Sequence, residues 1–329
     1  MQLQRLESVD AFVVRDLEGV PAAGVVRSAP KILTDGATWL ARSMTYRFAS
    51  FERRAGGASA GVNARPDDRA AAIATFPSAV EADVAAGELL LEPGKGIDAD
   101  GAAVLRAGDP RPDDWWAAHH DLTAAGVLAG LVAVGGADGT RVILEGVDAM
   151  APALRTALVG QLLAGGARIV AVSTSSGGAV APDGFDVERL ETALGADEPE
   201  VGAEAALAAE ADALLAGSRA GAISHELARE LAVRTVVGWG PLPVTAKALA
   251  ELGRAGCVVQ PDFVTTAGPS IVDPAGPLTD APAAVASAVA AVLAEVADHE
   301  HGPLLGACLR AEAFLASWTA ERPFGRPIA

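Results

Sequence analysis

The sequence predicts an α/β protein in which an N-terminal α/β domain precedes an open, doubly wound and mainly parallel sheet. Two observations lead to this fold class. Between residues 141 and 263, short buried strands alternate with helices, as in a parallel sheet covered on both faces. Within residues 1–54, short β-like runs are followed by one long amphipathic helix. The chain has 329 residues, of which 51% are apolar, so two domains and a sizeable core are expected.

The N-terminal part is expected to hold two strands and a helix. The strands are AFVV (11–14) and AGVV (23–26). The helix begins at Thr34, because apolar residues then recur at helical spacing, and it should end near Arg53–Arg54, before two glycines.

The next segment gives weaker signals. Residues 72–91 alternate too weakly between the helical and the strand period for an assignment. Residues 92–118 are rich in Gly, Pro and Asp, which predicts a long connection. A helix from about Leu122 to Val134 should follow it.

The clearest unit of the chain begins at Arg141. RVILEG (141–146) is a predicted strand that ends in glycine, and ARIVAVS (167–173) is a second buried strand. Between them, residues 151–166 should form a helix, with Pro152 near its start and two glycines at its end. A strand, tight turn, helix and strand within about 30 residues form a βαβ unit, which makes a parallel sheet.

The alternation continues toward the C-terminus. Further strands are predicted at 211–216, 234–239 and 257–263, and helices at 223–232, 244–256, 281–297 and 303–318. Residues 121–285 are therefore expected to form an open, mainly parallel sheet with helices on both faces.

Charge and cysteine content restrict the possible partners. Lys and Arg number 25 against 42 Asp and Glu, and the net charge of −17 repels phosphate backbones and anionic lipid, so no nucleic-acid or membrane partner is expected. A local group of arginines could still hold a small anion. The two cysteines suit a reducing cytoplasm, and the N-terminal MQLQRLESVD lacks the apolar stretch of a signal peptide.

Several motifs occur in one order along the chain. MTYRFASFERRAGGASAGV (44–62) resembles, without a gap, the signature M-T-Y-K-x-A-x-x-x-L-P-x-G-G-G-K-G-G-I of the glutamate/leucine/phenylalanine/valine dehydrogenases. Two later segments also resemble family patterns: LTAAGV (122–127) resembles the A-T-G-x-G-V helix start, and VILEGVDAMA (142–151) resembles V-x-x-x-G-x-G-x-V-G. Three further matches follow in order, at VAVSTSSGGAVAPDGFD (170–186), VVGWGPLPVTAKAL (236–249) and PDFVTTAGP (261–269). Because these matches are collinear from about residue 24 to residue 270, the chain is identified as a member of this family.

The resemblance implies a domain organisation and an activity. Residues 1–120 would form the substrate and oligomerisation domain, 121–285 a Rossmann-like NAD(P)-binding domain, and 286–329 helices that pack back toward the N-terminal domain. The family carries out NAD- or NADP-dependent oxidative deamination of an α-amino acid, with the substrate held between the two domains. A cytoplasmic homo-oligomer that uses no metal is expected.

The catalytic position of the family is altered. Ser59 stands where the family has its catalytic lysine, which must give up a proton near neutral pH. A lone hydroxyl is neither a cation nor a base, so standard activity is doubtful. The proton-shuttling aspartate of the family would be Asp100, which is preferred to Asp98 in the same loop.

The substrate-binding positions match the family signature better than the catalytic position does. Arg47 replaces the other lysine of the signature and keeps its charge, and a guanidinium can bind a carboxylate with two hydrogen bonds. Arg27 falls in GVVR, where the family has G-G-x-R, so it could supply a second cation. Gly56 and Gly57 match the glycines of the signature.

The cofactor-binding positions are degenerate. Asp148 replaces the glycine at which the backbone approaches the pyrophosphate, and there it could accept the amides at the start of the following helix in place of a phosphate. Pro241 and Thr266 replace asparagines, and Thr174 replaces the acidic residue that would hold the ribose. The remaining family positions are Gly146, which is kept, Ala151, which the pattern tolerates, and Thr123 at the A-T-G helix start.

Two other motifs carry less weight. GASAG (57–61) matches the G-x-S-x-G nucleophile elbow, but that elbow must lie between a strand and a helix, and here a helical run precedes it. His299-Glu300-His301 has the residue types of a metal pair, but it is better explained as a polar helix end before Gly302.

Two functions fit the altered positions. The favoured one is a catalytically degenerate relative, a pseudoenzyme that binds a small acid or regulates an active homologue by pairing with it. The alternative is an active oxidoreductase, or another enzyme of altered chemistry, that acts on an amino-acid-derived substrate.

Overall fold

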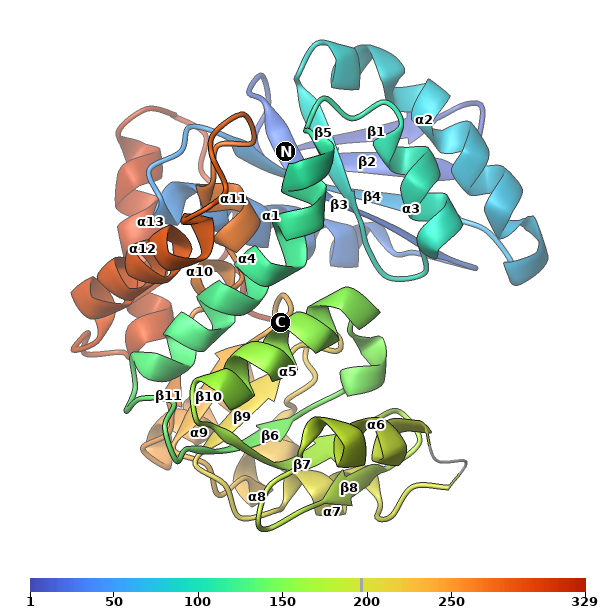
Figure 1. The fold of residues 1–329 in the computed structure, drawn as a ribbon. Coiled ribbons are helices and arrows are strands. Elements are labelled where there is room, and N and C mark those ends of the chain that lie inside the picture. Colours follow the sequence, from blue (N-terminus) through green and yellow to red (C-terminus); the bar gives the residue numbers. More distant parts are fainter. Residues whose placement is uncertain (196–197) are drawn as a thin grey trace. The chain divides into compact units, whose positions relative to one another are not determined.

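The computed structural model describes residues 1–195 and 198–329, and they fold into two compact units. Unit 1 comprises Met1–Pro112 and Cys308–Pro327, and unit 2 comprises Asp113–Ala307 and Ile328–Ala329. Figure 1 shows that each unit has its own sheet and its own helices. The division at residues 120 and 285 that the family resemblance implies stays a prediction.

Unit 1 is built on a five-stranded mixed sheet in the order β1-β2-β4-β3-β5. β3 is parallel to β4 and β5, whereas β2 is antiparallel to β1 and β4. The strands are β1 (Gln2–Leu6), β2 (Ala11–Arg15), β3 (Ala22–Ala29), β4 (Gly56–Asn63) and β5 (Leu89–Pro93), and the helices are α1 (Thr34–Ser50), α2 (Arg69–Ala85), α3 (Ala99–Arg106) and most of α13 (Pro303–Ala316).

The two faces of this sheet pack against different helices. Side chains of β4 alternate between them, as the period of a strand requires. Ala58, Ala60 and Val62 pack with Phe76 and Val80 of α2. On the other face, Phe12 and Val14 of β2 pack with Ala37 and Ala41 of α1. Residues Gly57, Ser59 and Gly61 of β4 therefore face α1.

The structure confirms the predicted strands at 11–14 and 23–26 and the helix from Thr34. It corrects the long connection predicted for 92–118, because α3 and the first turns of α4 (Asp113–Val132) lie within it. The side chain of Asp98 caps α3 by accepting the amide of Gly101 at 2.8 Å. The helix predicted at 122–134 is only the second half of α4.

Unit 2 contains a six-stranded sheet in the order β11-β10-β9-β6-β7-β8. All neighbouring strands are parallel except β8, which is antiparallel to β7, so the predicted doubly wound parallel sheet is confirmed. The strands are β6 (Arg141–Leu144), β7 (Arg168–Ser173), β8 (Gly178–Val180), β9 (Ala213–Ala216), β10 (Thr235–Gly238) and β11 (Val258–Val259).

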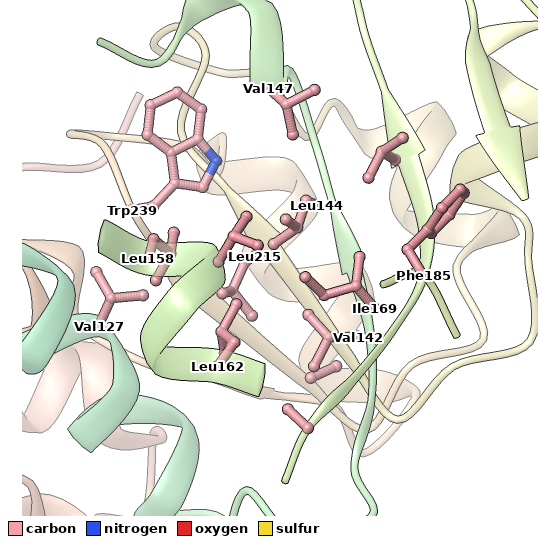
Figure 2. Packing of buried hydrophobic residues seen from close by; sticks show 14 of the residues in the cluster. Val127, Val142, Leu144, Val147, Leu158, Leu162, Ile169, Phe185, Leu215 and Trp239 are labelled. Carbon is pink, nitrogen blue, oxygen red and sulfur yellow. The ribbon is translucent and has the colours of Figure 1, made fainter. Parts of the chain in front are cut away.

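Helices cover both faces of the second sheet. Figure 2 shows Val142, Leu144 and Leu215 of the strands packed with Leu158 and Leu162. The alternate strand residues, such as Ile143 and Leu214, are also fully buried. The larger helices of unit 2 are α4, α5 (Pro152–Ala164), α6 (Val187–Gly195), α8 (His225–Glu230), α9 (Ala246–Arg254) and α12 (Ala281–Val296), and the shorter ones are α7 (Ala203–Leu207), α10 (Asp262–Thr265) and α11 (Gly268–Ile271).

One predicted strand of unit 2 is largely wrong. Of residues 257–263, only Val258 and Val259 form a strand, because Pro261 and Asp262 begin the short helix α10. A proline fits there, since the first turn of a helix has no partner for its amides. Among the helices of the described residues, none is both long and apolar enough to cross a membrane.

Candidate functional site

Ser59 lies in the middle of β4, between Val14 of β2 and Val25 of β3. Its side chain is fully buried, and its hydroxyl has no hydrogen-bond partner among the described residues. β4 continues to Asn63, so the strand–turn–helix geometry of a nucleophile elbow is not present around Ser59. With no base beside it, this hydroxyl is not activated for nucleophilic or acid–base chemistry.

The glycines of the signature are required by packing. A Cβ on Gly57 would lie 1.7 Å from the carbonyl oxygen of Ala41, so β4 and α1 meet backbone to backbone there. The amide of Gly57 donates to Thr45 Oγ1 at 2.9 Å, and its carbonyl accepts the amide of Asp16 at 2.9 Å. The amide of Gly56 donates to Pro21. These two amides are therefore engaged within the protein and not held open for a ligand.

Arg27 is a half-buried cation close to Ser59 in the sheet register. It lies on β3 two residues beyond Val25, the residue that pairs with Ser59, so both side chains project on the α1 face. Its Nε and Nη2 atoms are shielded from solvent and have no hydrogen-bond partner among the described residues. Burial lowers the pKa of its guanidinium. Shielded guanidinium nitrogens without a partner are unfavourable, and an anion in contact with them would supply the missing hydrogen bonds.

Two other arginines lie on α1. Arg47 is 9% exposed and stands in the last turn of the helix. Arg42 contacts Asp16 at 3.4 Å, and both side chains are buried. Burial raises the pKa of the Asp16 carboxyl, and a hydrogen bond from Thr45 and the charge of Arg42 oppose that shift only in part.

Asp100 does not lie beside Ser59. It is exposed in the first turn of α3, and Leu105 of the same helix packs against the α2 face of the sheet. Ser59 projects on the α1 face, so the structure places the two predicted catalytic residues on opposite faces. The catalytic role of Asp100 stays a prediction. Within residues 1–195 and 198–329, no group of three His, Cys, Asp or Glu side chains could hold a metal ion.

The second candidate site lies in unit 2, at the carboxyl ends of β6 and β9. The chain leaves β6 toward β7 on one side, and it later returns to β9 on the other side. Such a switch in strand order opens the crevice in which doubly wound sheets bind their ligands. Gly146, the predicted first glycine of the dinucleotide turn, follows β6 there with a φ of 64° that favours glycine.

Glu145 closes this crevice. Its carboxylate accepts the amides of Gly217 at 3.0 Å and of Ser218 at 3.1 Å, and it also accepts a short hydrogen bond from the Ser218 hydroxyl. Both partners directly follow β9, and Glu145 is only 8% exposed. A Cβ on Gly146 would lie 2.3 Å from Cβ of Ser218. The two strand ends are therefore in contact, and the amides of Gly217 and Ser218 already have an anion as partner.

Asp148 also accepts hydrogen bonds, but from a different partner than expected. Its carboxylate accepts the Ser175 hydroxyl at 2.6 Å and the Ser175 amide at 3.1 Å. The expectation that Asp148 would accept the amides of the following helix is wrong, because Asp148 lies in a separate 3₁₀ turn, Val147–Ala149, and α5 begins only at Pro152. Ala151 is the residue before α5, and its side chain makes no cap.

Three other predicted cofactor residues, all threonines, form hydrogen bonds with backbone groups three or four residues away in the chain. Thr174 Oγ1 lies 3.2 Å from the Gly177 carbonyl, to which it donates, and also 3.2 Å from the Gly177 amide, which it accepts. Thr266 donates to the carbonyl of Asp262 at 2.7 Å, and Thr123 donates to that of His119 at 3.0 Å.

Pro241 lies in a loop with a strained neighbour. Leu242 has a φ of 57°, a region that L-residues rarely adopt, and its amide donates to Asp262 Oδ2 at 2.8 Å. Leu242 is buried, so Asp262 and the packing of this side chain fix the loop together. As folded, the amides of Gly217 and Ser218 at this crevice are bonded to Glu145, so a pyrophosphate could use them only by displacing that carboxylate.

Sequence reasoning missed three residues of this site. Glu145 and Ser218 bridge the crevice, and Trp239 donates its indole N–H to the Glu145 carbonyl at 3.0 Å. The detectable signals were an acidic residue directly after a buried strand, in LEG, and a serine directly after another, in LLAGS. The contact between Glu145 and Ser218 could not be predicted, because the strand order decides which strand ends become neighbours.

Residues 135–272 match the sequence model of the glutamate/leucine/phenylalanine/valine dehydrogenase family. No curated protein matches the chain significantly.

Solved structures resemble the whole chain. The hetero-hexameric glutamate dehydrogenase of Thermus thermophilus, solved in a leucine-bound form, is 20% identical and has a TM-score of 0.76, with 98% of this chain and 89% of that chain covered. The glutamate dehydrogenase of Plasmodium falciparum is 13% identical with a TM-score of 0.74, and the match covers 94% of this chain and 80% of that one. The L-tryptophan dehydrogenase of Nostoc punctiforme is 17% identical with a TM-score of 0.65, and the match covers 96% of this chain and 95% of that one.

At these identities the likeness shows the fold, which is that of the two-domain amino-acid dehydrogenases with a Rossmann-like domain. The sequence similarity to the glutamate/leucine/phenylalanine/valine dehydrogenase family covers residues 135–272, and it agrees with this fold.

Proposed function

We propose that this chain is a catalytically degenerate member of its family, which binds a small carboxylate or regulates a homologue and does not use NAD(P) for oxidative deamination. The observation that supports this most is the closure of the switch-point crevice by Glu145. A dinucleotide would have to displace a buried carboxylate from three donors before its phosphates could take them.

Asp148 adds to this obstacle. A fixed negative charge at the position of the second glycine repels a phosphate, and two like charges at about 4 Å repel by roughly 4 kcal/mol at an intermediate effective dielectric. This would weaken cofactor binding several hundredfold or more. Asp148 and Glu145 are the main local causes in this proposal, and Thr174 and Pro241 contribute.

The catalytic position supports the same conclusion. General acid–base catalysis contributes roughly 10²–10⁴-fold to a rate, and Ser59 has no partner that would let it replace a lysine in that role. The hydroxyl is also fully buried in the sheet.

The carboxylate-binding part of the proposal rests on Arg27. Two guanidinium nitrogens that are shielded from water and have no partner favour a carboxylate, because the new hydrogen bonds would form where solvent competes little. Arg47 and the glycine-rich strand β4 would supply the rest of the site, as the family resemblance implies.

The first test is calorimetric titration of the wild type, Asp148→Gly and Asp148→Gly/Glu145→Gln with NAD and NADP. The wild type should show no micromolar binding, and the variants should gain affinity in that order. Micromolar binding by the wild type would defeat the proposal. If no variant binds, Asp148 and Glu145 are not the main obstacle, and Thr174 and Pro241 become the next positions to restore.

The second test measures thermal unfolding with a panel of amino acids and 2-oxo acids. A ligand of the native state raises the melting temperature of the wild type, but it should leave that of Arg27→Met unchanged. Arg54→Met is the matched control, because Arg54 is exposed. A carboxylate that stabilises all three proteins equally would not be bound by Arg27. Turnover of any of these substrates with NAD(P) would favour the alternative, an active oxidoreductase of altered chemistry.

A further inference from the structure

One cavity of unit 1 is lined by more cations than anions. It has a volume of about 210 Å³, and its walls come from α1, from α13 and from the segment that follows α13. The charged residues of the lining are Glu312, Arg322 and Arg326, so the cavity carries a surplus of one positive charge. In a chain with a net charge of −17, a local surplus of cations beside a cavity favours a small anion as its occupant.

The carboxylate in the cavity is already balanced by a cation. Arg326 donates to the two oxygens of Glu312, at 2.8 and 3.1 Å, and Tyr46 donates to the same carboxylate at 3.0 Å. Burial opposes the ionisation of Glu312, but these hydrogen bonds and the charges of Arg326 and Arg322 outweigh it, so the pKa of the carboxyl lies below its usual value. Glu312 and Arg326 therefore form a neutral pair.

Arg322 supplies the charge that is not balanced. Its side chain is exposed, and it makes no hydrogen bond or ion pair with another residue that the structure describes. It nevertheless lines the cavity, and its charge lowers the pKa of Glu312, so its guanidinium lies close to the pair and not far out in solvent. Its N–H donors are free to bind a carboxylate with two parallel hydrogen bonds.

The most deeply buried lining residues provide apolar surface. Tyr46 and Leu315 are each 1% exposed, and Pro323 adds a further apolar wall. A cavity of about 150 Å³ is large enough for benzene, so a volume of about 210 Å³ has room for a phenyl ring that carries a carboxylate. An aromatic ring can pack edge to face on the tyrosine and flat on a guanidinium, so these walls favour a planar ring.

The segment after α13 is held in place at both ends. Gly325 has a φ of 80°, a conformation that favours glycine, and the next residue, Arg326, bonds back to Glu312. At the other end, Glu321 accepts the amide of Glu18 at 3.0 Å. Because the walls are ordered in advance, little conformational freedom is lost when a ligand binds.

We propose that this cavity binds an aromatic carboxylate of about the size of benzoate. The carboxylate pairs with Arg322, and the ring packs against Tyr46 and Leu315. This site is separate from the one proposed at Arg27, which does not line the cavity. Unit 1 thus has a second anion site, and its occupancy does not depend on the function proposed above.

The test is titration of 4-fluorobenzoate into the wild type, Arg322→Met and Arg65→Met, followed by ¹⁹F NMR. The wild type should bind with a Kd on the order of 1 mM, as expected for so small a ligand. Arg322→Met keeps the apolar stem but lacks the charge, so it should weaken binding about 10-fold or more. Arg65→Met is the matched control and should bind like the wild type, because Arg65 is exposed and lies outside the cavity lining.

The chemistry of the ligand is tested with the neutral analogue 4-fluorobenzamide. It should bind the wild type as weakly as 4-fluorobenzoate binds Arg322→Met. Equal binding of the two compounds by the wild type would show that the cavity does not recognise a carboxylate, and the proposal would be wrong.

Two measurements locate the bound ligand. Photolabelling with 4-azidobenzoate should modify residues 312–326, and an excess of benzoate should protect them. Arg27→Met should leave the affinity for 4-fluorobenzoate unchanged. If Arg27→Met abolishes binding and Arg322→Met does not, the carboxylate occupies the site of the proposed function and the cavity is not a carboxylate site. If Arg322→Met alone abolishes binding, the cavity is the site, and the role of Arg27 is left to its own test.

Discussion

At the scale of single residues, the signature stretch has become a packing element. Gly57 lies against the backbone of α1, and its amide and carbonyl are both bonded inside the protein. Ser59 follows on the same face with a buried hydroxyl that no described residue contacts by a hydrogen bond. The glycines that match the signature are thus required by the packing of β4 against α1.

The first prediction concerns Gly57. Gly57→Ala should destabilise the fold by about 3 kcal/mol or more, at the upper end of the overpacking range, because the new Cβ would meet backbone atoms of Ala41 and Thr45 and α1 would have to move. Urea unfolding measures the free energy of unfolding. Gly160→Ala in α5 is the control, since nothing lies within 4 Å of its Cβ, and it should stabilise by up to about 1 kcal/mol. A neutral Gly57→Ala would show that the contact between β4 and α1 is loose.

The second prediction concerns the pH dependence contributed by Asp16. Burial raises the pKa of its carboxyl in the folded state, so the ionised form weakens the fold at neutral pH, and this penalty is lost as the pH falls through the raised pKa. Asp16→Asn does not titrate but keeps an acceptor for Arg42. The variant should therefore be the more stable protein near pH 7, and its advantage should shrink as the pH is lowered toward 4.

Urea unfolding at several pH values measures this advantage. Glu7→Gln, at an exposed position, is the control and should show no such trend. An advantage of Asp16→Asn that stays constant between pH 4 and 8 would contradict the assigned cause.

At the scale of elements, the end of α1 shows how the chain tolerates an unfavourable backbone. Glu52 follows the helix with a φ of 55°. The amide of Glu52 donates to the carbonyl of Ala49, and the amide of Arg53 donates to the carbonyl of Phe48. These two hydrogen bonds form a Schellman motif at the end of the helix. Glycine is the usual residue at this position, because a Cβ is disfavoured in the left-handed region.

The third prediction follows from this ending. Glu52→Gly should be more stable than Glu52→Ala by about 1 kcal/mol, because only glycine relieves the left-handed conformation. Both variants lose the same exposed ion pair with Arg310, so the comparison cancels it. Thermal unfolding under identical conditions gives the difference. Equal stability of the two variants would mean that the helix end relaxes to another conformation.

At the scale of the whole molecule, the proposed loss of activity rests on a different position in each unit. In unit 1, the lysine position holds an unactivated serine, and in unit 2, the crevice for the cofactor is bridged by the chain's own carboxylate. In the proposal, either difference alone impairs hydride transfer. The two units have kept their folds because their cores, made of alternating buried residues on both faces of each sheet, do not depend on the altered positions.

The fourth prediction is the absence of family activity. The purified protein should show no measurable NAD- or NADP-dependent oxidation of glutamate, leucine, phenylalanine or valine, because Ser59 supplies no acid–base group. Absorbance of the reduced cofactor measures the rate. A turnover near ~10 s⁻¹, a typical enzyme rate, with any of the four would refute the prediction. Ser59→Lys is the informative companion, since activity gained by it alone would show that the cofactor site still works.

The sequence by itself determined the fold class and the altered positions. Periodicity predicted the parallel sheet of unit 2 and the long helix α1, because buried faces impose a repeat that is visible in the chain. Collinear motifs predicted the family and pointed to Ser59, Asp148 and Pro241. Periodicity did not predict β4, since a strand buried on both faces and made of Gly, Ala and Ser has no polar alternation.

The tertiary structure alone decided which groups meet. Glu145 and Ser218 are 73 residues apart in the chain, and they touch only because β6 and β9 are neighbours in the sheet. Asp148 binds Ser175 and not the helix after it, because a separate turn intervenes. Ser59 and Asp100 are parted by the sheet that lies between α1 and α3. Local sequence sets propensities within a few residues, whereas contacts between distant residues depend on strand order and register, which short-range patterns do not encode.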